Sequence, residues 1–261
     1  MGVLNVTPDS FADGGRFVQL EDAVARGLQM AQEGATIIDV GGESTRPGAE
    51  PVGLEEELRR VVPVIAQLRS RTQAIISVDT SKAEVMQAAA AAGAGMINDV
   101  RALRAPGALE AAVTSGCAVC LMHMLGEPRT MQDAPRYADV VGEVRRFLGA
   151  RVETCLAAGL PLERMVLDPG FGFGKTLAHN LELLRRLSEL SVHGLPLLAG
   201  LSRKSMAGAL TGRPAAERVH GSVALAVVAA LNGASILRVH DVAATVDALQ
   251  VVGAVRPPVS A

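Results

Sequence analysis

The 261 residues predict an α/β fold, a (β/α)8 TIM barrel formed by residues 1–261 as a single domain. Short apolar runs alternate with helical patterns, and eight such strand–helix units can be counted along the chain. The runs are continuously apolar, as in parallel strands that are buried on both faces. No linker or charged run divides the chain, and a doubly wound open sheet, the structural alternative, usually has fewer strands.

Strands are predicted where β-branched or other apolar residues follow one another with few interruptions. These segments are residues 2–6, 36–42, 74–80, 95–100, 118–123, 165–170, 197–202 and 236–240. Eight parallel strands in a chain of this length are typical of a closed barrel in which a helix follows each strand.

Helices are predicted between these strands, where apolar residues recur with the helical period. The clearest patterns cover residues 20–34, 53–71 and 81–93. The first and the third end in Gly, the residue most often found directly after a helix. Glu55, Glu56 and Glu57 are expected in the first turn of the second helix, where carboxylates complement the helix dipole.

Polar residues stand at or just after the carboxyl ends of the predicted strands. They are Asn5, Asp39, Asp79, Asn98, Asp99, His123, Asp168, Ser202, Arg238 and His240. In a parallel barrel these ends meet on one face, and active sites lie there. Polar residues needed only for solubility would instead be spread over the helix surfaces. We therefore expect one shared site at this end of the barrel.

The composition argues against several classes of function. The formal net charge is −2, without blocks of either sign, whereas binding to nucleic acid or to an anionic membrane needs clustered Lys and Arg. The longest uncharged run, residues 222–237, is too short to span a membrane. No signal-peptide pattern is visible, and three cysteines, an odd number, indicate reduced thiols. We expect a cytoplasmic protein.

The segment LDPGFGFGKT does not have the spacing of a nucleotide-binding motif. A phosphate-binding P-loop requires Gly where Pro169 stands, and a dinucleotide fingerprint would need a third glycine and an acidic residue. The alternative is a glycine-rich turn. In such a turn Pro169 fixes the direction of Asp168, and the glycines allow the backbone to approach a planar ligand closely.

Three further residues have competing interpretations. Cys117 and Cys120 are expected in the core rather than in a zinc site, because strand positions three apart face opposite sides. His123 is either a hydrogen-bonded histidine at a strand end or a functional residue, and the sequence leaves both open.

Cations follow the last two predicted strands, in the region where barrels commonly bind phosphate. Lys204, Arg238 and His240 together favour an anionic substrate, although each alone could form a surface ion pair. A loop with Thr45 and Arg46 lies between Gly and Pro residues, and loops of this kind can cover a site when ligand binds.

Eight segments together resemble the dihydropteroate synthases, a family of pterin-binding enzymes. They are MGVLNVTPDSFADGG, IIDVGGESTRPGAEPV, ISVDTSK, GMINDV, LMHM, LDPGFGFGKT, LAGLSRKS and GASILRVHDV, in this order and over essentially the whole chain. The resemblance implies a transferase of folate biosynthesis, which condenses p-aminobenzoate with 6-hydroxymethyl-7,8-dihydropterin pyrophosphate to give 7,8-dihydropteroate and pyrophosphate. It also implies Mg²⁺ as the metal, sulfonamides as competitors of p-aminobenzoate, and a homodimer formed through the late helices.

The resemblance assigns residues to each part of the site. The pterin would contact Asp79, Asn98, Val100, Met122, Asp168 and Lys204. The pyrophosphate would be held by Asn5, Thr45, Arg238 and His240, with Asn5 also a ligand of Mg²⁺. The p-aminobenzoate would be surrounded by Phe11, Arg46, Pro47, Phe173, Lys204 and Ser205. Catalysis would involve Asp79, Lys204 and Asp13. Of these, Asp13 would stabilise a pterin cation.

Two other functions stay open at this point. Methyltransferases that pass a methyl group from methyltetrahydrofolate to a corrinoid protein share the pterin pocket, but would not need Arg46 or the Lys204–Ser205 pair. A catalytically silent relative that binds a ligand or a partner is the other. Family members also carry residues before the first strand that often cap the lower face of the barrel, so we expect either that cap to be missing or the start to lie upstream.

Overall fold

The computed structural model describes residues 1–6, 16–44, 51–126, 131 and 134–255, and eight parallel strands form one sheet in the order β1 to β8. The strands are β1 (Gly2–Asn5), β2 (Ile37–Gly41), β3 (Ile75–Asp79), β4 (Met96–Asp99), β5 (Ala118–Met122), β6 (Met165–Asp168), β7 (Leu197–Ala199) and β8 (Ala234–Leu237). Each lies within a segment predicted as a strand, except that β8 begins earlier, at Ala234. The prediction of a (β/α)8 barrel is confirmed.

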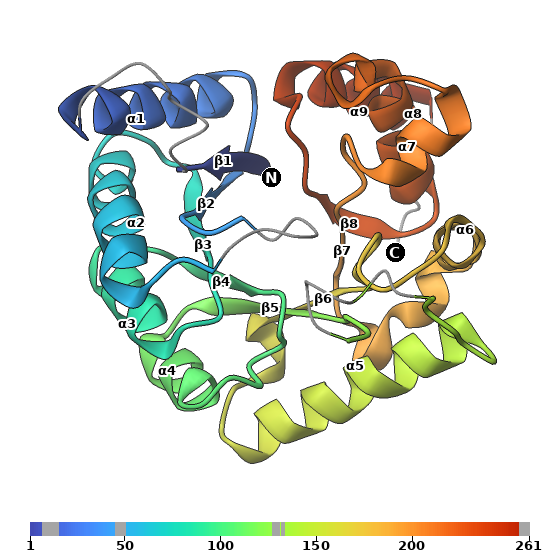
Figure 1. Ribbon diagram of the computed structural model, residues 1–261, viewed down its shortest axis with the longest axis horizontal. Helices are drawn as coiled ribbons and strands as arrows, with labels where there is room; N and C mark the ends of the chain where they lie inside the picture. Colours follow the sequence, from blue (N-terminus) through green and yellow to red (C-terminus); the bar gives the residue numbers. More distant parts are fainter. Residues whose placement is uncertain (7–15, 45–50, 127–130, 132–133, 256–261) are drawn as a thin grey trace.

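Backbone hydrogen bonds join the end of β8 to β1. Val3 N donates to Val239 O at 2.9 Å, and Val239 N donates to Met1 O at 2.9 Å. A parallel bridge between Gly2 and Val239 accompanies them. The sheet therefore closes on itself, and the helices surround it (Figure 1).

The helices follow the strands in the alternation that the sequence predicted. They are α1 (Arg16–Gln32), α2 (Leu54–Arg69), α3 (Ala83–Ala91), α4 (Ala108–Ser115), α5 (Val140–Ala157), α6 (Leu177–Arg185), α7 (Ser205–Thr211), α8 (Val219–Leu231) and α9 (Val242–Val255). Short 3-10 turns cover Leu162–Arg164, Leu187–Leu190, Val192–Gly194 and Ala215–Glu217. Among the described residues, none of the helices combines the length and the apolar character needed to cross a membrane.

Two of the three buried apolar clusters among the described residues form the parts of the core on either side of the sheet. The larger part fills the space between the sheet and the helices and includes Ile38, Val78 and Cys117. The smaller part, called here the interior cluster, lies inside the barrel and consists of Ile37, Met96, Cys120, Val166 and Leu198, with Met1, Ala118 and Ile236 packed against it. Cys117 and Cys120 are therefore both core residues on opposite sides of the sheet wall, as the strand period predicted.

Candidate active site

Polar side chains lie directly above the interior cluster. Each even-numbered strand places one residue in this cluster or against it, namely Ile37, Met96, Val166 and Ile236. Residues two positions further along a strand point to the same face. In these strands, and just past the end of β8, those residues are Asp39, Asn98, Asp168 and Arg238. The barrel interior thus changes from apolar to polar within one layer, at the carboxyl end of the sheet.

Arg238 joins two buried carboxylates. Its Nε donates to Asp39 Oδ2 at 2.6 Å, and its Nη2 donates to Asp79 Oδ2 at 2.7 Å. Asp39 also accepts hydrogen bonds from Ser77 Oγ at 2.6 Å and from Asn98 Nδ2 at 3.0 Å. Burial raises the pKa of Asp79 to about 7, although the Arg238 guanidinium lowers it. Asp39 is therefore the centre of a buried network that fixes both Arg238 and Asn98.

Asp168 is a buried carboxylate beside the partly buried ammonium group of Lys204. Its Oδ1 accepts a hydrogen bond from Gly170 N at 2.7 Å. Burial raises the pKa of Asp168, and the positive charge of Lys204 lowers it. Lys204 Nζ donates to Phe171 O at 2.6 Å and lies 4.8 Å from the ring centre of Phe173. Burial lowers the pKa of Lys204 to about 8. Since an ionised carboxylate offers about four acceptor positions, Asp168 can still accept from a ligand.

Lys175 holds the turn that follows Asp168. Gly170 has a φ of +69°, and a Cβ on it would overlap His123 O, so the two backbones touch. Lys175 Nζ donates to Gly170 O at 2.9 Å and to Phe173 O at 3.0 Å, and it lies 2.9 Å from His123 Nδ1. Burial lowers the pKa of Lys175 to about 7 and that of His123 to about 3. A neutral His123 accordingly accepts from Lys175.

An apolar cluster lies beside these polar groups. It consists of Val100, Met122, Met124 and Met131, with Phe173 packed against it. Methionine side chains adapt to flat surfaces because they are unbranched and polarisable. The cluster can therefore cover one face of a planar ring whose edge reaches Asp168.

Two hard oxygen donors lie on either side of Gly41. A Cβ on this glycine would lie 3.8 Å from Asn5 Oδ1 and 3.9 Å from Asp79 Oδ2. Amide and carboxylate oxygens suit Mg²⁺, which is commonly held by few protein ligands together with water and substrate phosphate. Within the described part of the chain, no group of three or more His, Cys, Asp or Glu could hold a metal ion. Asn5 Oδ1 and Asp79 Oδ2 have the chemistry of Mg²⁺ ligands, and water and substrate phosphate would have to supply the others.

The remaining residues of the predicted site have different positions. Ser202 Oγ accepts from His240 N at 3.2 Å and lies 3.1 Å from His240 Nδ1. Ser205 is exposed at the first position of α7. Five predicted residues lie outside the described part of the chain: Phe11, Asp13, Thr45, Arg46 and Pro47.

One sequence-based expectation needs correction. Asp99 does not face the polar layer, since its carboxylate accepts from Ser81 Oγ, from Arg101 N at 2.8 Å and from Leu103 N at 2.7 Å. It holds the turn after β4, because neighbouring strand residues face opposite sides. Glu57 lies in the first turn of α2 as expected, but it is 1% exposed.

The buried Glu57 is paired rather than solvated. Its Oε2 accepts a short hydrogen bond from Lys82 Nζ, and its Oε1 accepts from Thr80 Oγ1 at 2.6 Å. Lys82 Nζ also donates to Glu43 Oε2 at 2.5 Å. The Glu57 carboxylate thus ties α2 to the end of β3.

Sequence reasoning assigned no role to Asp39 or Lys175. Asp39 stands among the polar strand ends, and the signal was a carboxylate at the third position of the otherwise apolar run IIDV. Lys175 belongs to the segment that lacks the P-loop spacing, and no spacing in the sequence indicates that its ammonium group is buried.

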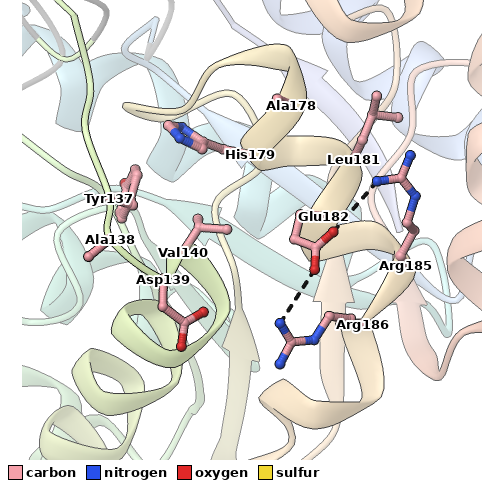
Figure 2. A pocket seen from close by; sticks show the side chains of 10 residues that line it. All are labelled: Tyr137, Ala138, Asp139, Val140, Ala178, His179, Leu181, Glu182, Arg185 and Arg186. Atoms are coloured by element: carbon pink, nitrogen blue, oxygen red, sulfur yellow. Dashed lines mark hydrogen bonds and ion pairs between the residues drawn. The ribbon is translucent and has the colours of Figure 1, made fainter.

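A groove of about 680 Å³ lies between the start of α5 and α6. Its lining includes Tyr137, Asp139 and His179. Figure 2 shows Glu182 between Arg185 and Arg186, with which it forms ion pairs at 3.5 and 3.4 Å. Asp139 and Glu182 balance the charges of Arg185 and Arg186 along the groove, so it does not present a concentrated charge.

Comparison with known proteins gives consistent results over nearly the whole chain. The model of the pterin binding enzyme family matches residues 1–240. The dihydropteroate synthase of Escherichia coli strain K12 is 57% identical over 254 residues, which cover 97% of this chain and 90% of that protein.

Solved structures agree with the sequence comparison. The dihydropteroate synthase of Yersinia pestis with a sulfonamide drug complex has a TM-score of 0.93 and 55% identity, over 98% of this chain and 93% of that one. The Xanthomonas albilineans enzyme with 4-aminobenzoic acid has a TM-score of 0.93 and 58% identity, over 98% and 92%. The resemblance noted in the sequence is confirmed.

Proposed function

The chain belongs to the family of pterin-binding enzymes, and on that premise we propose that it acts as a dihydropteroate synthase, a transferase of folate biosynthesis. It condenses p-aminobenzoate with 6-hydroxymethyl-7,8-dihydropterin pyrophosphate and releases 7,8-dihydropteroate and pyrophosphate. One observation in this chain carries the proposal: the buried Asp168 lies beside Lys204, next to an apolar cluster.

The pterin binds with its amino-pyrimidine edge against Asp168. A carboxylate matches two parallel N–H donors, in the same fork geometry that makes Arg–carboxylate pairs specific. The other residues proposed for this ring are Asp79, Asn98, Val100, Met122 and Lys204. A ring without these donors would leave buried polar groups unsatisfied, at a cost of about 1 to 3 kcal/mol each. This cost makes the pocket selective.

The pyrophosphate lies above the layer that Arg238 occupies, with Asn5, Thr45 and His240 as further contacts. Arg238 uses Nε and Nη2 for Asp39 and Asp79, so its Nη1 can donate to an anion. Asn5 Oδ1 and the bound pyrophosphate would hold Mg²⁺, which stabilises negative charge on phosphate oxygens.

The p-aminobenzoate binds between the end of β7 and the turn after β6. Lys204 and Phe173, already in contact, supply a cation and a ring, and Ser205 begins α7. Phe11, Arg46 and Pro47 complete this part of the site by resemblance alone.

The amine nitrogen of p-aminobenzoate attacks the exocyclic methylene carbon of the pterin. The new C–N bond forms, the C–O bond to pyrophosphate breaks with its electron pair on oxygen, and the amine loses a proton. Arg238 and His240 stabilise the departing charge, and Asp13 stabilises the positive charge on the pterin. No protein nucleophile is needed. The pterin substrate binds first.

Exposed apolar residues on the late helices support a homodimer. Val228 and Leu231 of α8 are 41% and 42% exposed, and Val251 and Val255 of α9 are 64% and 75% exposed. The two helices pack against each other, so their outer faces can form one surface. The three free cysteines are consistent with a reducing, cytoplasmic environment.

An assay of pyrophosphate release tests the proposed function. Release is expected only when both substrates are present, and it should be reduced by a sulfonamide that competes with p-aminobenzoate. Methyl transfer from methyltetrahydrofolate, or binding of pterin without turnover, would instead indicate one of the two alternatives.

A further inference from the structure

Arg203 and Asp241 form an ion pair between the connections that follow β7 and β8. Arg203 Nε donates to Asp241 Oδ2 at 3.0 Å, and Nη2 donates to Oδ1 at 2.5 Å. The side chains are 38% and 17% exposed, so the pair lies at the rim of the barrel rather than in the core. Two parallel bonds of this kind fix the orientation of both groups as well as their distance.

The backbone of Arg203 is constrained as well. Its φ is +59°, a left-handed conformation that residues other than glycine adopt at a cost. Arg203 N donates to Ser222 Oγ at 2.9 Å, and Arg203 O accepts from Arg218 Nη1 at 3.0 Å. Residues of α8 and the segment before it therefore hold one strained residue in place.

The neighbours of this pair are the residues proposed to bind the substrates. Arg203 lies between Ser202, which contacts His240, and Lys204, which reaches the Asp168 turn. Asp241 directly follows His240. Two adjacent cross-links, Ser202 to His240 and Arg203 to Asp241, thus join the connection that carries Lys204 to the connection that carries His240.

We propose that Arg203 and Asp241 are positioning residues, whose ion pair holds Lys204 and His240 in register so that the ring and pyrophosphate ends of the pterin substrate are gripped together. Lys204 is proposed to bind the ring, and His240 the pyrophosphate. A shift of one connection against the other would leave each cation able to bind its own group, but not both groups of one substrate. This inference rests on the proposed function.

The test compares Asp241→Asn, Arg203→Gln and the double variant. Each single variant is expected to raise the KM for the pterin pyrophosphate roughly tenfold, because Lys204 and His240 are no longer held in the relative position that suits both ends of one substrate. The double variant should show the same rise and no further one, since both changes break one interaction. The melting midpoint should move by no more than about 2 °C, because ion pairs this exposed add little stability.

Two further variants separate positioning from folding. Arg203→Gly removes the pair and relieves the left-handed strain, so it should fold and still show the raised KM. Arg203→Lys keeps the charge without the fork and should restore part of the affinity. The matched control is Arg186→Gln, which breaks another two-bond pair, at 2.8 and 2.7 Å to Glu189, and should leave the KM unchanged.

Each result has one meaning. If the parent enzyme released no pyrophosphate from its two substrates, the proposed function would fail. If the parent were active and Asp241→Asn kept the parent KM, only the inference would be wrong. A large fall of the melting midpoint in Arg203→Gly with an unchanged KM, or additive losses in the double variant, would also overturn it.

Discussion

Replacing Asp39 with asparagine should weaken both the fold and the grip on pyrophosphate. Asp39 has no exposed surface and accepts hydrogen bonds from Ser77, Asn98 and Arg238. The substituted side chain would have the same shape but no charge. Its single oxygen can still accept from Arg238 and Asn98, while the Ser77 hydroxyl can rotate to accept from the new amide.

The magnitude follows from these three contacts. The loss at Ser77 should be small, because the hydroxyl changes role. The loss at Arg238 is that of a buried charge pair, and removing a partner from such a pair costs about 3 to 5 kcal/mol. Arg238 retains Asp79 at 2.7 Å, so we expect a smaller value, about 2 to 3 kcal/mol. For a chain of this size that corresponds to a melting midpoint lower by roughly 4 to 12 °C.

Urea unfolding at pH 8 measures the free energy, and steady-state kinetics measure the KM for the pterin pyrophosphate, which should rise. Ser77→Ala is the matched control, since it removes one hydroxyl donor from the same carboxylate but leaves the pair with Arg238 intact, and it should cost about 1.5 to 3 kcal/mol without changing the KM. The reasoning is refuted if Asp39→Asn unfolds within about 0.5 kcal/mol of the parent and binds the substrate equally well.

Three other variants test separate parts of the structure. Asp168→Asn should lower the affinity for 6-hydroxymethylpterin by roughly 10- to 100-fold in calorimetric titration, because one of the two acceptor oxygens is replaced by an NH2 donor and the charge is lost. Equal affinity would contradict the assignment. Lys82→Met should lower the free energy of unfolding by about 3 to 5 kcal/mol, since Glu57 stays buried without its cation, and Glu57→Gln in the same chain should recover part of it. The His123→Gln variant should lose less stability than the parent as the pH falls below 6.5. The pKa of His123 is lowered to about 3 in the folded protein, so unfolding takes up a proton below pH 6.5. The free energy of unfolding of the parent should therefore fall by up to about 1.4 kcal/mol per pH unit. A parent whose stability does not fall between pH 6 and 5 would exclude this effect.

The strands could be predicted because each is a short apolar run buried on both faces, which leaves a clear signal. The sequence also indicates which strand residues point inward, because successive residues of a strand face opposite sides. Asn98 and Asp99 are neighbours in β4, yet Asn98 donates to Asp39 inside the barrel and Asp99 holds the turn outside it. The polar residues were grouped by their position at strand ends, and the strand period would have separated these two.

The contacts of Lys175 and Glu57 could not be read from the sequence. Lys175 is buried where four acceptors from two separate connections converge on its ammonium group. Glu57 looks like an ordinary acidic residue of a first helical turn until Lys82 and Thr80 approach it from the end of β3. Both depend on distances between segments that local patterns do not encode.

The polar side chains directly above the interior cluster point into the barrel because each stands two residues after an apolar residue of that cluster or packed against it. Asn98 points inward because Met96 does, and Asp168 because Val166 does. An insertion or deletion of a single residue inside such a strand would exchange inward and outward sides. Ile97 or Asp99 would then point inward in place of Asn98, so the active site would be lost even if the barrel still formed. Insertions and deletions on this scaffold are therefore better tolerated in the surrounding connections than in the strands.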